Sequence, residues 1–101
     1  MDDARFAEPT ETVGEHLAEF MSEYGVRAPT LARRLGVPRS RVVRLLEGAR
    51  CDGDMALRLA HAFATTPQFW LNLQAMRDLS EARALRGEEI ARTVRPVDPA
   101  A

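Results

Sequence analysis

Apolar residues recur every three or four positions through most of the chain, which is the spacing of amphipathic helices. Short polar or glycine-containing turns separate these runs, and the alternation typical of strands is nearly absent. The predicted helices cover residues 13–24, 28–35, 39–47, 53–64 and a longer segment from 67 to about 86. The sequence therefore predicts an all-α, five-helix protein with an extended C-terminal helix.

Local signals mark where the predicted helices begin and end. Thr12 and Glu15 have the spacing of a capping box before the first apolar run. Thr66, followed by a proline, is a typical start for the last helix. Gly87 is expected to end that helix, which leaves residues 88–95 as either a short helix or an edge strand.

Length and composition predict one domain with two loose ends. A chain of 101 residues is the size of a single domain. Residues 1–11 are expected to form a flexible arm, residues 12–95 the domain, and residues 96–101 a frayed tail. No apolar run is long enough to span a membrane, the start lacks the order of a secretory signal, and Cys51 is the single cysteine. These features favour a cytoplasmic protein.

The net charge of −1 conceals a strong asymmetry along the chain. Residues 1–24 contain seven acidic residues and one arginine, whereas residues 27–50 contain seven arginines and one glutamate. A basic block inside an otherwise acidic protein indicates an anionic partner for that block. Charged faces are usually only solvated, but seven arginines against one acid is a poor composition for such a face because like charges repel.

The basic block has the spacing of two short helices joined by a tight turn, over residues 28–47. Ala32 is small enough for a close helix crossing, Gly36 permits the turn, and aliphatic residues hold the second helix on the core. The polar side chains left on the outer face of the second helix are those of Arg39, Ser40, Arg41 and Arg44. A cationic ridge on a rigidly held helix is what entry into the DNA major groove requires.

This stretch resembles the helix-turn-helix of the phage-repressor-like (XRE) family, and the match covers residues 13–64. In that family the start of the second helix reads bases, which implies base contacts by Arg39, Ser40 and Arg44. By the same resemblance, Val43 contacts a thymine methyl group, and Arg41 contacts a phosphate or a base at the rim. Arg50 is expected to reach the DNA backbone. The helix predicted over residues 28–35 lacks the usual capping residue at its start. Arg27 is expected to replace the phosphate contact of that residue by its charge.

The segment after the fourth predicted helix narrows the family. Residues 66–74 read Thr-Pro-Gln-Phe-Trp-Leu-Asn-Leu-Gln, and with residues 56–63 and 87–92 they closely resemble HigA-type antitoxins. The resemblance spans most of residues 13–95. It implies a homodimer that binds double-stranded DNA, at a palindromic operator in its own promoter. It also implies a partner, a HigB or RelE-like ribonuclease toxin, that is neutralised by complex formation.

Apolar side chains cover more than one side of the last predicted helix. One apolar stripe suffices to pack this helix on the core, and Trp70, Leu71 and Leu79 add apolar surface on other sides. We therefore expect these three residues at the dimer interface. The acidic arm and first helix would suit a basic toxin.

Nothing in the sequence favours catalysis or a bound cofactor. His16 and His61 are isolated, which argues against a metal site, and no base accompanies Cys51 or Ser40 at the spacing of a nucleophilic site. We therefore expect a non-enzymatic antitoxin and autorepressor. The alternatives are a free-standing XRE-family repressor without a toxin and a protein-only interaction module.

Overall fold

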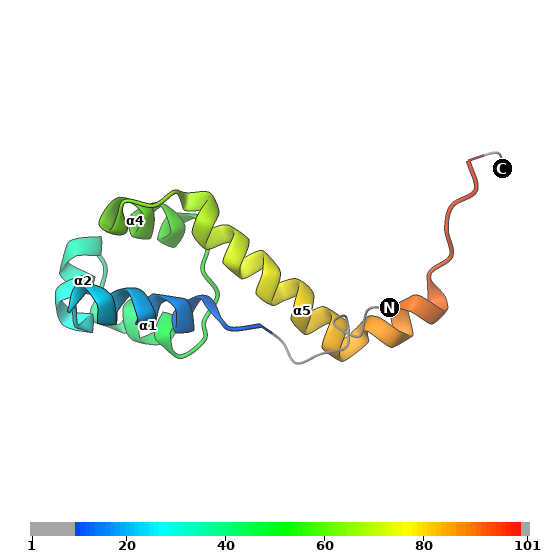
Figure 1. Cartoon of the computed structure of the whole chain (residues 1–101), viewed down its shortest axis with the longest axis horizontal. Coiled ribbons are helices and arrows are strands. Elements are labelled where there is room, and N and C mark those ends of the chain that lie inside the picture. The colour runs from blue at the N-terminus through cyan, green and yellow to red at the C-terminus, as the bar shows by residue number, and fades with distance from the viewer. Residues whose placement is uncertain (1–9, 100–101) are drawn as a thin grey trace.

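The computed structural model describes residues 10–99, and these residues form five helices and no strand (Figure 1). The predicted all-α, five-helix fold is confirmed. The helices are α1 (Val13–Tyr24), α2 (Ala28–Leu35), α3 (Arg39–Leu46), α4 (Gly53–Phe63) and α5 (Pro67–Thr93). Helices α1 to α4 gather into a body at one end of the molecule, and α5 runs out of that body toward the C-terminus.

Side-chain caps start three of the helices. The Thr12 hydroxyl accepts a hydrogen bond from the Glu15 backbone N–H at 3.1 Å, and the Glu15 carboxylate accepts one from the Thr12 N–H at 2.7 Å. This is the predicted capping box, and the second bond is the main cause of the lowered pKa of Glu15. The Asp52 carboxylate accepts from the backbone N–H of Met55, and the Thr66 hydroxyl accepts from that of Phe69, the third residue of α4 and of α5. The cap at Thr66 confirms the predicted start of the last helix.

The core lies between α1, α2, α3, α4 and the first two turns of α5. Its largest fully buried side chain is Trp70, which is 0% exposed and donates from Nε1 to the Thr65 hydroxyl at 2.7 Å. The Trp70 ring packs on Phe20 and Phe63, with ring centroids 5.0 and 6.1 Å away. The expectation that Trp70 belongs to a dimer interface is therefore wrong. The turn between α4 and α5 brings this ring into the chain's own core, where no second copy can touch it.

Helices α1 and α3 approach each other unusually closely at Gly14. A Cβ atom added there would overlap the backbone oxygen of Leu45 and lie 2.9 Å from the Leu46 Cα. Only glycine fits at this crossing, because the atoms that a side chain would meet belong to the backbone of α3. Gly14 therefore sets how tightly α3 sits on the body.

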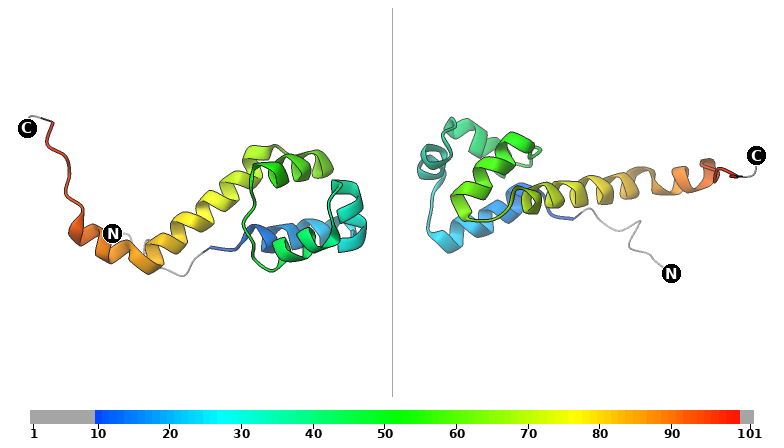
Figure 2. Two further views of the ribbon diagram at one scale, coloured as in Figure 1. Left: turned by 180° about the vertical axis from the view of Figure 1, so that it is seen from behind. Right: turned by 90° about the horizontal axis from the view of Figure 1, so that it is seen from above.

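The last helix is longer than predicted. Instead of stopping before Gly87, α5 continues as one helix to Thr93, so residues 88–93 are neither a separate helix nor a strand (Figure 2). A glycine inside a helix costs only about 1 kcal/mol relative to alanine, and neighbouring interactions can outweigh this cost. Here Arg86 pairs with Glu89 across the glycine at 2.7 Å, and Glu88 pairs with Arg92 just after it at 3.6 Å.

The two chain ends differ in how they are held. Most of the predicted flexible arm, residues 1–9, lies outside the described residues. Thr10 belongs to the predicted arm but is attached to α5, because its backbone N–H donates to the Ser80 hydroxyl at 2.9 Å. Residues 94–99 are exposed and irregular, as a tail would be. Across residues 10–99, no helix has both the length and the apolar character that crossing a membrane requires.

Candidate nucleic-acid interface

One side of α3 faces the core and the other faces solvent. Val42 and Leu45 are buried and hold the helix on α1 and α2. The opposite side carries four side chains at positions i, i+1, i+4 and i+5, which we call the α3 ridge: Arg39, Ser40, Val43 and Arg44. The structure thus brings together, on a single helical face, all four residues that the sequence predicted as base contacts.

The arginines that lack a partner gather in the helix-turn-helix. Within residues 10–99, the arginines with neither an ion pair nor a hydrogen bond are Arg27, Arg34, Arg39, Arg44 and Arg83. Four of these five lie between residues 27 and 44. Most arginines of α5 instead pair with a carboxylate one turn away. The α3 ridge therefore presents two cations that no acid of the described chain neutralises.

Arg41, the remaining arginine of α3, is directed toward α4. Its Nη2 lies 3.4 Å from the Asp54 carboxylate, which also accepts a hydrogen bond from Arg58 Nε at 2.7 Å. The two arginines hold the pKa of Asp54 below its usual value, with the Arg58 hydrogen bond as the largest cause. Arg41 is therefore already paired within the chain, and it lies beside the ridge instead of on it.

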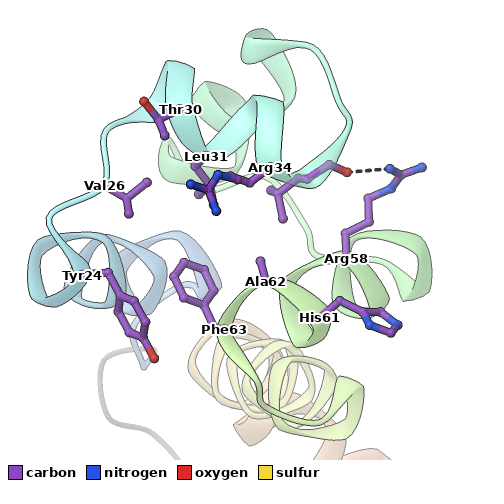
Figure 3. A pocket seen from close by; sticks show the side chains of 10 residues that line it. Tyr24, Val26, Thr30, Leu31, Arg34, Arg58, His61, Ala62 and Phe63 are labelled. Atoms are coloured by element: carbon purple, nitrogen blue, oxygen red, sulfur yellow. Dashed lines mark hydrogen bonds between the residues drawn. The ribbon is translucent and has the colours of Figure 1, made fainter.

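Arg58 binds the backbone next to the turn of the helix-turn-helix, a contact that the sequence did not predict. Its Nη1 donates to the carbonyl oxygen of Leu35 at 2.7 Å, at the C-terminal end of α2 (Figure 3). A cation at this position meets the negative end of the α2 dipole and binds a carbonyl that the helix leaves unpaired. Figure 3 shows this bond at the edge of a cleft of about 500 Å³ between α1, α2 and α4. The spacing of Asp54 and Arg58 predicts their ion pair, but the bond to Leu35 depends on the tertiary fold.

The loop between α3 and α4 is attached to α5 by a set of polar contacts that we call the loop clamp. Arg50 makes two parallel hydrogen bonds to the Asp78 carboxylate, at 2.6 and 2.9 Å. Gln74 accepts from the Cys51 backbone N–H at 2.8 Å and donates to Asp78 at 2.9 Å. The Arg50 side chain, a predicted phosphate contact, is 70% exposed but already paired with Asp78. The pairing lowers the pKa of Asp78, with the Arg50 bond as the largest cause.

A small cleft next to the α3 ridge is walled by three arginines. It has a volume of about 140 Å³ and is lined by Arg41, Arg44, Leu45, Ala49, Arg50, Asp52 and Met55. The Asp52 carboxylate, which accepts the Met55 backbone N–H, offsets part of the positive charge of these walls. On the other side of the motif, Arg27 precedes α2 without a side-chain cap and is exposed. Cationic groups therefore flank the ridge on both sides.

Cys51 is not placed for nucleophilic chemistry. Its side chain is 2% exposed, and burial raises the pKa of the thiol to about 11, with a smaller contribution from the charge of Asp52. Within residues 10–99, no three side chains of the histidine, cysteine or acidic types come together as a metal site. The α3 ridge and the arginines beside it are thus suited to binding an anion.

We predict that this thiol reacts slowly in the native protein. The thiolate is the form that attacks a thiol reagent, so a buried thiol with a pKa of about 11 should be modified only when the fold opens. The measurement is the rate of reaction with Ellman's reagent at pH 8, with and without denaturant. Equal rates in the two conditions would contradict the burial of Cys51.

The chain matches no protein-family model, but individual relatives cover most of it. Antitoxin HigA-1 of Vibrio cholerae is 39% identical over 87 residues, which make up 85% of this chain and 82% of that protein. An addiction module antidote protein of the HigA family from Coxiella burnetii has a TM-score of 0.86 at 39% identity, covering 89% of this chain and 100% of that one. The Pseudomonas aeruginosa antitoxin HigA, solved with the higBA promoter, has a TM-score of 0.83 at 35% identity, covering 90% of this chain and 100% of that one.

Proposed function

The chain belongs to the HigA family of antitoxins, and from that premise we propose that it is the antitoxin of a type II toxin–antitoxin pair. In this proposal it acts in the cytoplasm in two ways. As a homodimer it binds a palindromic operator and represses its own promoter. By forming a complex it neutralises a RelE-like ribonuclease toxin. The ribonuclease activity belongs to the toxin, and we assign no catalytic step to this chain.

The α3 ridge is the observation that carries the DNA-binding part of the proposal. Its two unpaired arginines stand on a helix that Val42 and Leu45 brace from behind. Arginine forms bidentate hydrogen bonds with guanine in the major groove, and an aliphatic residue such as Val43 can contact a thymine methyl group. We therefore assign base contacts to Arg39, Ser40, Val43 and Arg44. The related antitoxin from Pseudomonas aeruginosa, solved with the higBA promoter, supports DNA as the ligand of this chain.

The phosphate contacts are assigned to the cations beside the ridge. Arg27 is exposed and unpaired at the start of α2, where free backbone N–H groups also favour an anion. Arg41 and Arg50 line the small cleft at the start of α4. Each is held by a carboxylate of the chain, so each must share its donors between that carboxylate and a phosphate. We expect them to contribute less salt dependence than Arg27 does.

The dimer surface is assigned to one face of α5. Leu79 is 51% exposed and lines a mostly apolar hollow of about 300 Å³ on the projecting part of the helix. The other lining residues are Ala82, Arg83, Gly87, Ile90 and Ala91. An uncovered apolar face of this kind indicates a contact with another chain. We propose a second copy of this chain as the occupant, because a two-fold dimer doubles the base contacts of a single ridge. Leu71, which is partly exposed near the start of α5, is assigned to the same interface.

We predict that Leu79→Asp converts the dimer to a monomer. The new carboxylate has Arg83 one helical turn away, but burying both charges between two copies costs more hydration than their attraction returns, so the two copies should separate. Sedimentation equilibrium measures the change. Leu85→Asp is the matched control, because Leu85 is 76% exposed and does not line the hollow. A Leu79→Asp protein that remains dimeric would show that another face joins the copies.

Toxin binding is assigned on charge. Glu19 and Glu23 lie one helical turn apart on the exposed side of α1. An acidic face of this kind complements a basic ribonuclease and would speed its capture. We propose that the toxin docks on this side of α1, away from the α3 ridge.

The test of the proposed function combines a DNA assay with a toxin assay. Gel-shift titration with the DNA upstream of the chain's own gene, at two salt concentrations, is expected to show tight binding that weakens as salt rises. Co-expression with the product of the neighbouring short gene is expected to relieve growth arrest and to yield a stable complex. DNA binding without any complex would favour the free-standing repressor. Complex formation without DNA binding would favour the protein-only module.

A further inference from the structure

Helix α3, which we call the recognition helix because it carries the proposed base contacts, does not touch α5, the helix assigned to the dimer. Among the described helices, α3 packs against α1 and α2, whereas α5 packs against α1 and α4. The loop clamp makes a direct polar connection between α5 and the segment that follows α3. It consists of Arg50 and the Cys51 N–H on the loop, and of Gln74 and Asp78 on α5.

The side-chain amide of Gln74 is buried and hydrogen-bonded through both its oxygen and its nitrogen. Its side chain is 7% exposed, its amide oxygen accepts from the Cys51 backbone, and its amide nitrogen donates to Asp78. A buried backbone N–H without a partner is costly, so the loop must sit where this bond can form. Asp78 in turn receives two parallel bonds from Arg50, which fix the angle of the guanidinium as well as its distance.

We infer that Gln74 and Asp78 are positioning residues that set where the recognition helix stands relative to α5, and hence which half-site spacing the dimer accepts. This inference rests on the proposed function, because it needs a dimer that binds DNA. The two recognition helices of a dimer must lie about 34–36 Å apart to enter successive major grooves on one side of DNA. The loop clamp joins the α3–α4 loop to α5, and α5 is the helix assigned to the contact between the two copies. The clamp therefore sets how far apart the two α3 helices of the dimer lie.

The experiment uses the full chain and three operator duplexes. One is the natural palindrome upstream of its own gene, and the other two have one base pair inserted or removed at its centre. A duplex with a single half-site reports the affinity of one recognition helix. The variants are Gln74→Met, which keeps the shape of the side chain without its hydrogen bonds, and Asp78→Asn, which weakens the hold on Arg50. Thr93→Val is the matched control, because it removes a side-chain hydrogen bond on α5 that does not contact the loop.

We expect the wild type and the Thr93→Val control to prefer the natural spacing by about tenfold or more. In Gln74→Met and Asp78→Asn this preference should fall at least about threefold, with dimerisation retained. Half-site affinity should not fall in either variant, and in Asp78→Asn it should rise, because Arg50 is then freed for a phosphate. Asp78 is partly exposed, so Asp78→Asn is expected to fold even if Gln74→Met does not.

Two results would count against the inference, and they are distinguishable. If both variants keep the spacing preference and lose affinity equally for all duplexes, the clamp only stabilises the fold, and the proposed function stands. If the wild type binds none of the duplexes, the proposed function fails, and the inference fails with it.

Discussion

The double variant Arg39→Ala, Arg44→Ala is expected to lose nearly all of its preference for the operator over unrelated DNA. An arginine that reads a base contributes about 1–3 kcal/mol to that discrimination, and a dimer would lose each contact twice. The arginines are unpaired in the described chain, so their removal should leave no carboxylate without a partner. The measurement is the ratio of operator to nonspecific affinity by gel shift or fluorescence anisotropy at fixed salt. Thermal melting should be nearly unchanged.

A charge control separates base reading from simple attraction. Arg95→Ala removes one cation from the tail, where the arginine bonds only a backbone carbonyl of Arg92. This change is expected to leave the affinity ratio as it is. Retained operator preference in the Arg39, Arg44 double variant would refute the assignment of the α3 ridge to the major groove, even if the chain binds DNA by another surface.

Gly14→Ala is expected to destabilise the protein by about 3 kcal/mol or more, because the new methyl group would overlap backbone atoms of α3. Alanine favours helix more than glycine does by about 1 kcal/mol, but this gain is smaller than the expected clash. For a domain of this size each kcal/mol lowers the Tm by about 4–8 °C. The variant should also bind the operator more weakly, because α1 and α3 can relieve the overlap only by moving apart.

Gly53→Ala provides the comparison for Gly14→Ala. Gly53 is also in the first turn of a helix, but a Cβ atom there would have no neighbour within 4 Å. This substitution is expected to leave the Tm unchanged or slightly higher. If the two alanine variants melt at the same temperature, the close approach of α1 and α3 does not hold in solution. Circular dichroism melting of both proteins is sufficient to decide.

Several features were predictable from short stretches of sequence because their causes are local. The capping box at Thr12 and the cap at Thr66 depend on residues three positions away. The α3 ridge follows from helical spacing alone, since burying Val42 and Leu45 leaves the other side exposed. The end of α5 was predicted wrongly because the glycine signal is weak. An ion pair across Gly87 and another just after it offset part of the cost of the glycine.

The interior of the protein was harder to predict, because apolar spacing alone does not say what a side chain packs against. Trp70 and Leu79 both belong to apolar patterns on α5. One is sealed in the core by the turn before it, whereas the other is left in solvent on the projecting part of the helix. The apolar spacing along α5 does not by itself distinguish these two environments. The sequence therefore predicted an interface on this helix, and the structure corrected one of its members.

The sequence by itself determined the five helices, their starts and the face of α3 that carries arginine, because these depend on neighbours within one or two helical turns. Only the tertiary structure decided which arginines are free. Asp54 and Asp78 reach Arg41 and Arg50 across 13 and 28 residues of chain, and Gly14 meets the backbone of Leu45 at the crossing of α1 and α3. Such contacts arise when helices pack, and spacing along a single helix cannot reveal them.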